Sequence, residues 1–428
     1  MSAQVRLALV GVVLSVPLVV RWATWPESRR HDLHASAVAA GKELFLHEWT
    51  PGDALSPGGD GLGPVFNATS CVACHRDPIA GGSGPIDANV TTFVIRPTVA
   101  DRPLRQGVVH AAATSAEFRE RLQHLHPSLP EELPPPEPEL PTMAGCFAPS
   151  FVLPEGIDLS QRNTPALFGA RLIDEIPDEA IIAGERRQRL KWGLATHDVE
   201  HAPVGRALRL PDGRVGRFGW KGQTPSLAGF VQAACANELG LGNPGQAQPV
   251  SLAKADYAAP GLDLTQEQCD QITAFCASLE RPVEIIPTDA IERGQAQAGK
   301  KLFHTLGCAD CHTPDLGGVE GLYSDLLLHR MGRELRGGGG YDDPPLPLPT
   351  PDDESDESGP HPTEWRTPPL WAVADTAPYL HDGRAETLHE AILLHDGQGK
   401  AAADRFRSLP PEDQTRLLAF LNTLRAPQ

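Results

Sequence analysis

Two copies of a Cys-x-x-Cys-His motif constrain this chain more than any other feature of its sequence. The first copy is Cys71-Val72-Ala73-Cys74-His75 and the second is Cys308-Ala309-Asp310-Cys311-His312. Two thiols at this spacing fit on one helical turn, where they can form thioethers with both vinyl groups of one haem, and the adjacent histidine can ligate the iron. The motifs therefore predict two covalently bound haem c groups, attached through Cys71, Cys74, His75, Cys308, Cys311 and His312.

A single Cys-x-x-Cys could also be half of a zinc site or a thiol redox motif. A zinc ribbon needs its second cysteine pair nearby, whereas these two pairs begin at positions 71 and 308. A thioredoxin-like motif should lie beside a βαβ pattern, which neither copy shows. Because both copies continue into histidine and follow similar text, covalent haem is the favoured interpretation.

Three sequence echoes surround the two motifs in the same order. Ala40–Phe45 matches Ala298–Phe303 at all but one position. The segment Arg162–Gly169 is echoed by Arg366–Trp371, and a third echo pairs Trp220-Lys221-Gly222…Leu227 with His381-Asp382-Gly383…Leu388. This order predicts a duplicated architecture: an N-terminal haem domain over residues 34–284 and a C-terminal haem domain over residues 285–428.

Periodic apolar positions and capping residues predict a mainly α fold with long irregular Pro/Gly-rich loops and few strands. The 428 residues include 41 Gly and 42 Pro, which favours extensive loops. The predicted strand is Val90–Ile95. The predicted helices are His34–Leu46, Ser115–Leu125, Leu264–Leu279, Asp289–Leu306, Leu322–Arg330, Thr387–Leu394 and Pro411–Leu424.

The N-terminal segment, residues 1–25, predicts export. Arg6 precedes the apolar run Leu7–Val20, which resembles a secretory signal and is short for a full bilayer span. No clear small-x-small cleavage site follows the run, so an uncleaved membrane anchor stays open as the alternative. We expect a periplasmic or otherwise exported body. The formal net charge of −18 argues against nucleic acid as a partner.

Four cysteines lie outside the haem motifs, namely Cys146, Cys235, Cys269 and Cys276. In an oxidising compartment an even number permits disulfides, and buried free thiols are the alternative. Cys269 and Cys276 lie two turns apart on a predicted helix, too far to bridge each other.

The sixth ligand of each iron decides whether that iron is open to substrate. Leu388, Ala391, Ile392 and His395 follow the spacing of one helical face, so His395 points to the core while His389 points elsewhere. A histidine on such a face can be a hydrogen-bonded core residue or the second ligand of the C-terminal haem. Met331 is the rival ligand, because a thioether is the other common choice.

The first haem motif has no comparable partner in the sequence. His110 is a weak candidate, and a surface histidine is the favoured interpretation of that position.

These residues together resemble the di-haem cytochrome c peroxidase and MauG superfamily, and most of all its di-haem oxidoreductase family. The segments that carry the resemblance are Cys71–His75, Asn163-Thr164-Pro165, Arg217–Lys221, Tyr323–Met331 and Arg366–His395. The resemblance covers nearly all of the chain after the N-terminal segment, and Arg366–His395 is its most specific part.

The resemblance implies roles for individual residues. His395 falls where the superfamily places the sixth ligand of the C-terminal haem, usually Met or Tyr, so that haem would be bis-histidine and of lower potential. Trp220 matches the tryptophan between the haems, a candidate electron relay, and Glu238 falls near the acid–base glutamate. The positions that match a calcium site between the domains are Asn163, Thr376 and Pro378. The usual distal histidine has no match.

The expected function is an exported di-haem c-type cytochrome with electron transfer between its haems and peroxidase-like oxidoreductase activity at the N-terminal haem. The alternative is a plain electron-transfer cytochrome without substrate chemistry. The expected cofactors are two haem c groups and Ca²⁺. The expected partners are an electron-donor protein of cytochrome or cupredoxin type and a peroxide substrate, with membrane attachment through the N-terminal segment left open.

Overall fold

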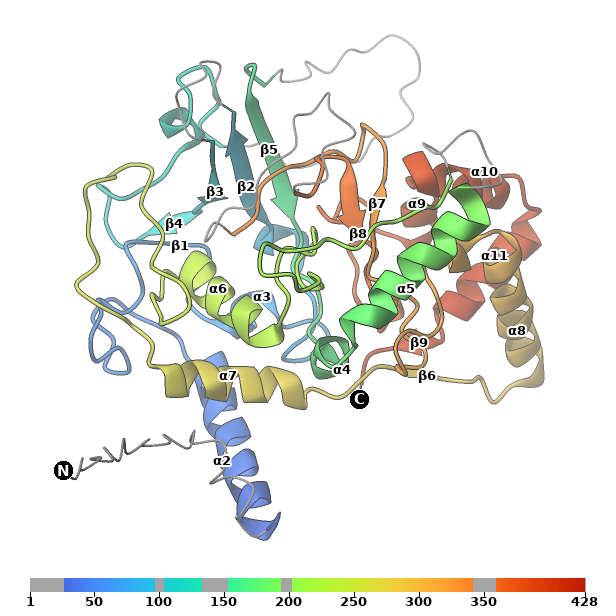
Figure 1. Ribbon diagram of the computed structural model, residues 1–428, viewed down its shortest axis with the longest axis horizontal. Coiled ribbons are helices and arrows are strands. Elements are labelled where there is room, and N and C mark those ends of the chain that lie inside the picture. Colours follow the sequence, from blue (N-terminus) through green and yellow to red (C-terminus); the bar gives the residue numbers. More distant parts are fainter. Residues whose placement is uncertain (1–26, 97–103, 133–152, 194–201, 342–358, 428) are drawn as a thin grey trace, which may run out of the picture.

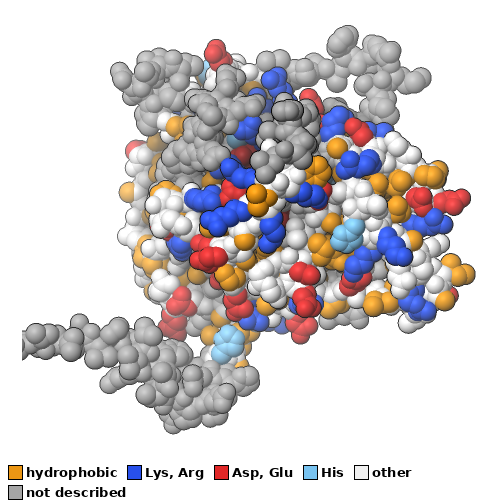
Figure 2. Space-filling model, turned by 45° about the vertical axis from the view of Figure 1, so that its right-hand side comes forward, with side chains coloured by type: hydrophobic (Ala, Val, Ile, Leu, Met, Phe, Trp, Pro, Cys, Tyr) orange, Lys and Arg blue, Asp and Glu red, His pale blue; other side chains and the backbone are white. Residues whose placement is uncertain are grey.

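The computed structural model describes residues 27–96, 104–132, 153–193, 202–341 and 359–427. The predicted export segment and Cys146 lie outside these ranges. The described part is rich in helix and modest in sheet, as the sequence predicts (Figure 1). No helix within the described ranges is long and apolar enough to cross a membrane. On the face in Figure 2, acidic and basic side chains are interspersed.

Five of the seven predicted helices are confirmed, with ends that differ by at most seven residues. The α-helices are α2 (Glu27–Leu46), α3 (Cys71–Cys74), α4 (Ala170–Asp174), α5 (Asp178–Gln188), α6 (Leu227–Leu239), α7 (Gln266–Ser278), α8 (Ala290–Thr305), α9 (Leu388–Leu393), α10 (Lys400–Arg407) and α11 (Pro411–Leu421). Short 3-10 turns are η1 (Ile86–Ala88), η2 (Leu122–His124), η4 (Cys308–Asp310), η5 (Val373–Asp375) and η6 (Gly397–Gly399), and a π-turn, η3 (Arg189–Gly193), follows α5.

Helix α7 shows how local sequence sets a helix start. The Thr265 hydroxyl accepts the backbone N–H of Gln268 at 3.2 Å, and the Gln268 side chain accepts the backbone N–H of Thr265 at 2.9 Å. This reciprocal capping box satisfies two backbone donors that the helix itself leaves without partners. The predicted cap of this helix is confirmed.

A three-stranded antiparallel sheet has the order β3-β2-β5, with β2 (Val90–Ile95) in the centre (Figure 1). The predicted strand is confirmed as β2. Its neighbours are β3 (Arg105–Val109) and β5 (Ile157–Arg162). The remaining strands form short antiparallel pairs: β1 (Val65–Phe66) with β4 (Ala112–Ala113), β6 (Val283–Glu284) with β9 (Leu424–Arg425), and β7 (Leu328–Arg330) with β8 (Glu364–Arg366).

The two copies of the Ala-Gly-Lys sequence each allow two helices to pack closely, one copy in each of two different cores. A Cβ on Gly41 of α2 would lie 1.8 Å from the carbonyl oxygen of Gln271 in α7. A Cβ on Gly299 of α8 would lie 1.9 Å from the carbonyl oxygen of Arg416 in α11. In each case only glycine lets the two helix backbones approach so closely.

The larger hydrophobic core lies where α2, α6 and α7 meet and includes Phe45 and Phe275, with ring centroids 5.0 Å apart. It also includes Leu316, Leu322 and Leu327 from later in the chain. The second core joins α8, α10 and α11 through Phe303, Phe406 and Phe420. The described cysteines outside the motifs are buried free thiols: Cys235, Cys269 and Cys276.

The predicted helix Leu322–Arg330 is wrong. This segment is a turn followed by the strand β7, and Tyr323 and Leu326 have left-handed φ values of 52° and 58°. The Ser324 hydroxyl accepts the N–H of Leu326, and the Asp325 carboxylate accepts the N–H of Leu327. These side chains satisfy backbone donors that a helix would use, so the apolar run stays extended.

The predicted helix Ser115–Leu125 is also wrong, apart from the single turn η2. Glu120 turns its carboxylate inward, where it accepts the N–H of His110 at 2.8 Å and of Leu252 at 2.6 Å. This buried polar contact holds the segment in turns. The local sequence gives no sign of it because His110 and Leu252 lie in other segments.

Candidate haem sites

The first Cys-x-x-Cys-His motif lines a cavity of about 430 Å³, here called the first cavity. The four residues Cys71–Cys74 form the single turn α3, and the backbone N–H of His75 donates to the carbonyl of Cys71 at 3.0 Å. This turn brings both thiols and the imidazole to one cavity wall. The predicted attachment residues of the first haem therefore lie together.

The ring of His75 is oriented for ligation. Its Nδ1 donates to the carbonyl oxygen of Gly82 at 3.2 Å, which leaves Nε2 as the nitrogen available to a metal. Burial lowers the pKa of His75 to about 4. The imidazole is therefore neutral near pH 7, and the neutral form is the one that binds iron.

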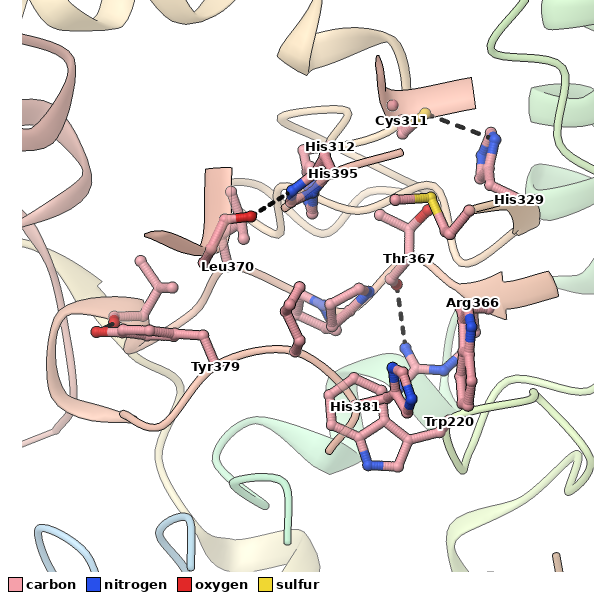
Figure 3. A pocket seen from close by; sticks show the side chains of 18 of the residues that line it. Trp220, Cys311, His312, His329, Arg366, Thr367, Leu370, Tyr379, His381 and His395 are labelled. Carbon is pink, nitrogen blue, oxygen red and sulfur yellow. Dashed lines mark hydrogen bonds between the residues drawn. The ribbon is translucent and has the colours of Figure 1, made fainter. Parts of the chain in front are cut away.

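The second motif repeats this arrangement in a cavity of about 520 Å³, the second cavity (Figure 3). The turn η4 contains Cys308, and the backbone N–H of His312 donates to the Cys308 carbonyl at 3.0 Å. The Nδ1 of His312 donates to the Tyr323 carbonyl at 3.0 Å. Burial, and then the charge of nearby His395, lowers the pKa of His312 to about 4.

His395 and His312 both line the second cavity, and their side chains lie close together (Figure 3). The two ring centroids lie 6.5 Å apart, and the Nδ1 of His395 donates to the carbonyl of Ala391 at 2.7 Å. Imidazole–metal bonds of about 2 Å on each side of one ion would place two ring centres at about this separation. The pair therefore fits a shared iron, as the helical spacing predicts.

Met331, the rival ligand, lines the same cavity. A Cβ on Gly399 would lie 3.1 Å from the Met331 methyl carbon and 3.1 Å from the Cβ of His395, so the two candidates are neighbours. The ring pair of His312 and His395 favours the histidine, with the thioether beside it.

The third sequence echo has a structural counterpart, and it reveals a difference between the cavities. The bridge Phe218↔Thr224 precedes α6, and the bridge Tyr379↔Ala385 precedes α9, at a constant offset of 161 positions. The same offset carries His395 of the second cavity onto Ala234, which lines the first cavity. By this offset, an alanine of the first half corresponds to the histidine of the second.

No second imidazole replaces it within the described residues. Among the described residues that line the first cavity, His75 is the only histidine, and none is a methionine. The first cavity thus presents one imidazole to an iron, and the second presents two.

Trp220 lines both cavities and stands in the wall between them. Its Nε1 donates to the carbonyl of Asn163 at 2.8 Å. Its own carbonyl accepts the N–H of Arg366 at 2.9 Å, and the Arg366 side chain donates to the Gly219 carbonyl at 2.8 Å. These contacts fix the indole in a position between the predicted haems.

Glu238 lies in the last turn of α6 and lines the first cavity. Its Oε2 accepts a hydrogen bond from the Asn67 amide at 2.7 Å, and Tyr341 also hydrogen-bonds to it. Burial raises the pKa of Glu238 above its usual value, which the two hydrogen bonds only partly offset. A buried carboxyl group that keeps hydrogen-bond partners can take up and release a proton during a reaction.

The sequence interpretation of His110 as a surface residue is wrong. Its side chain is buried, with Nδ1 2.9 Å from Glu120 and Nε2 2.9 Å from the carbonyl of Asn237. Both ring nitrogens are therefore engaged, and His110 does not line either cavity.

The predicted calcium residues Asn163, Thr376 and Pro378 all line the second cavity. A Cβ on Gly383 would lie 3.0 Å from Pro378 and 3.4 Å from the Asn163 amide, so these two residues are close neighbours. The Asn163 side-chain nitrogen donates to Gly84 and Asn89. Calcium at this position stays a prediction.

A polar cluster beside the second motif is absent from the sequence predictions. The Nδ1 of His329 lies 3.5 Å from the Cys311 sulfur (Figure 3). Its Nε2 lies 2.9 Å from Asp325, and Gln188 donates to the same carboxylate at 2.7 Å. These contacts orient the imidazole against the sulfur that a haem would use. The sequence signal that could have drawn attention to His329 is its position two residues before Met331, within the segment Tyr323–Met331 that carries the family resemblance.

A family model described as "Di-haem oxidoreductase, putative peroxidase" matches residues 141–424. The chain therefore belongs to the di-haem oxidoreductase family, as the sequence motifs predict. Membership implies haem cofactors and haem-based oxidoreductase chemistry. The search of curated proteins finds no match.

Several solved structures are similar to this chain at low identity. Hydrazine synthase of Kuenenia stuttgartiensis is 18% identical, with a TM-score of 0.36 and coverage of 62% of this chain and 73% of that chain. A MauG-like protein associated with microbial copper homeostasis is 20% identical, with a TM-score of 0.25 and coverage of 59% and 90%. A variant of the di-haem peroxidase BthA from Burkholderia thailandensis is 15% identical, with a TM-score of 0.39 and coverage of 91% and 86%.

Proposed function

We propose that this protein is an exported di-haem c-type cytochrome that reduces a peroxide at its first cavity and receives electrons at its second. The difference at one pair of corresponding positions carries the proposal. His395 lies near His312, whereas the corresponding residue Ala234 lines a cavity in which His75 is the only histidine among the described lining residues. A filled sixth position favours electron transfer, and an open position permits chemistry.

Each half has its own residues for a covalent haem. Cys71, Cys74 and His75 would hold one group, and the residues of the other site are Cys308, Cys311, His312 and His395. The proposed haem domains are residues 34–284 and 285–428. The haems supply the redox chemistry when bound.

The chain supplies position and protons. The His75 imidazole, held by Gly82, leaves the opposite side of the first cavity for peroxide. Glu238 accepts a proton from the incoming peroxide and returns it to the leaving oxygen, because its carboxyl group is buried yet hydrogen-bonded. Trp220 lies between the cavities as the proposed electron relay.

The remaining parts of the proposal rest on the sequence and the family. The N-terminal segment directs export to the periplasm, with or without membrane attachment. The electron donor is a protein of cytochrome or cupredoxin type. Asn163, Thr376 and Pro378 would hold a calcium ion through oxygen atoms.

Steady-state reduction of hydrogen peroxide by the purified holoprotein tests this function. A pre-reduced small cytochrome or cupredoxin serves as the electron donor, and its oxidation is followed optically. The expected result is donor oxidation that depends on both peroxide and holoprotein. Reduction of the haems by the donor without any peroxide consumption would leave the protein as a plain electron carrier.

A further inference from the structure

Tyr341 lines the first cavity although its sequence position belongs to the proposed C-terminal domain. Its phenol hydrogen-bonds to Glu238, and its ring lies 5.8 Å from that of Phe230 at an interplanar angle of 33°. His75 lines the same cavity. A segment from the second half of the chain therefore places a hydroxyl group beside the acid–base candidate of the first.

The four glycines before Tyr341 explain how the chain reaches this place. Gly338 accepts hydrogen bonds from the Thr92 hydroxyl at 2.9 Å and from Arg162 at 2.7 Å, so the backbone runs directly over β2 and β5. A Cβ on Gly337 would lie 2.1 Å from the Ser160 hydroxyl, and a Cβ on Gly340 would lie 2.5 Å from the Gln223 side chain. Side chains in this run would push the segment away from the sheet.

Gly339 adds a conformational requirement. Its φ of +80° belongs to the left-handed region, and a Cβ there would lie 2.9 Å from the carbonyl oxygen of Phe93. The glycine run thus sets the position of the Tyr341 backbone, and the Phe230 ring limits the directions in which the Tyr341 phenol can point.

The phenol and the carboxyl group form a donor–acceptor pair. Burial and the charge of Glu238 raise the pKa of Tyr341 well above its usual value, so the phenol keeps its proton. Asn67 holds the Oε2 of Glu238. The other hydrogen-bonding aromatic residue in the wall, Trp220, already donates to Asn163.

We propose that Tyr341 is the distal hydrogen-bond donor of the first cavity, oriented by Glu238 and acting on the oxygen of a bound peroxide or on a small anion. This inference rests on the proposed function and supplies the group that stands in for the missing distal histidine. The phenol carries one proton, which points to Glu238 while that carboxylate is ionised. Once Glu238 is protonated and donates to the phenol oxygen, the phenol O–H can turn to the bound oxygen or anion.

The proton and electron balance of the step is complete. Glu238 accepts one proton from hydrogen peroxide and donates it to the phenol oxygen of Tyr341. This frees the single phenol proton of Tyr341 to pass to the departing oxygen, and Glu238 is ionised again. The O–O bond breaks, and the departing oxygen leaves as water. Two electrons from the donor protein and two protons from solvent convert the other oxygen to a second water.

Fluoride binding to the ferric holoprotein tests the donor role without turnover, because a bound fluoride accepts a hydrogen bond from a distal donor. The variant is Tyr341→Phe, which keeps the ring on Phe230. The matched control is Tyr257→Phe, since the Tyr257 phenol bonds to Asp60 and lines neither cavity. Covalent haem content is measured for each protein.

Loss of one hydrogen bond to an anion should weaken fluoride binding by about tenfold in Tyr341→Phe and leave Tyr257→Phe at the wild-type value. Peroxide reduction should fall in Tyr341→Phe in the same preparations. Equal fluoride affinity in wild type and Tyr341→Phe would overturn this inference alone. A wild-type protein that binds neither fluoride nor peroxide would overturn the proposed function, and this inference with it.

Discussion

The two cavities are built from the same parts but differ at the position opposite the motif histidine. Each has a one-turn Cys-x-x-Cys segment followed by a histidine whose Nδ1 is held by a backbone carbonyl. Each is bordered by a glycine-containing turn that leads into a helix. The helices then diverge, because α6 presents Ala234 where the chain after α9 presents His395.

Under the proposed function, this divergence would give two sites of similar construction different roles through a few side chains. Under the proposed function, two imidazoles would close the second site to exogenous ligands. Among the described residues that line the first cavity, none is a second histidine or a methionine, and the proposed proton-transfer pair, Glu238 and Tyr341, lies there. The turn position occupied by Trp220 in the first half is His381 in the second, so the wall also differs.

Removal of one motif should have the largest effect. The double variant Cys308→Ser with Cys311→Ser cannot form thioethers, so the protein should retain one covalently bound haem instead of two. Intact-mass spectrometry and haem quantification measure the change. Cys269→Ser, at a buried thiol outside both motifs, is the control and should retain both haems. Two covalent haems in the double variant would contradict the assignment of this motif.

Exchange of Ala234 and His395 between the two cavities should reverse the spin states of the two haems. His395→Ala should make the second haem high-spin, and Ala234→His should make the first haem low-spin and abolish peroxide binding, because a strong sixth ligand fills the site. Optical and magnetic circular dichroism spectra report both spin states. Met331→Leu is the control for the second cavity. A spin-state change in Met331→Leu, with His395→Ala unchanged, would make Met331 the ligand.

Glu238→Gln should lower peroxide reduction by about 100-fold, the usual contribution of a general acid–base group. The second haem should keep its wild-type spectrum. Burial raises the pKa of Glu238, and only its ionised form accepts a proton. Wild-type activity should therefore rise as pH increases through this raised pKa.

A pH–rate profile of both proteins checks the assignment. The rising limb should be present in wild type and missing in Glu238→Gln. The same limb in both proteins would assign the proton transfer to another group.

Trp220→Phe should have the smallest effect among these changes. Phenylalanine keeps an aromatic ring in the wall but loses the bond from Nε1 to Asn163 and is harder to oxidise. Electron transfer between the haems should slow by about tenfold, an activation cost of about 1.4 kcal/mol. Stopped-flow mixing of half-reduced protein with peroxide measures this rate. An unchanged rate would show that electrons bypass Trp220.

The sequence predicted the parts of the site that depend on local spacing. The Cys-x-x-Cys-His motifs and the helical face of His395 follow from a few adjacent positions. The third echo aligned Trp220 of the first half with His381 of the second. The constant offset also links His395 to Ala234, a comparison that the aligned echoes could have provided. Each of these features is written in short segments of sequence.

Features that depend on contacts between distant segments were not predictable in this way. Tyr341 reaches the first cavity only because Gly338 lies against β2 and β5. The run Gly337–Gly340 was the available signal, since four consecutive glycines before an aromatic residue indicate a close backbone approach. His110 was assigned to the surface because its partners, Glu120 and Asn237, come from other segments.

Electron paramagnetic resonance of the fully oxidised wild-type holoprotein tests the central difference most directly. The two haems should give one high-spin and one low-spin ferric signal in equal amounts. Fluoride should change only the high-spin signal, because His75 has an open opposite side and His312 does not. Two low-spin signals that are insensitive to fluoride would contradict an open first cavity. Two high-spin signals would contradict a closed second cavity.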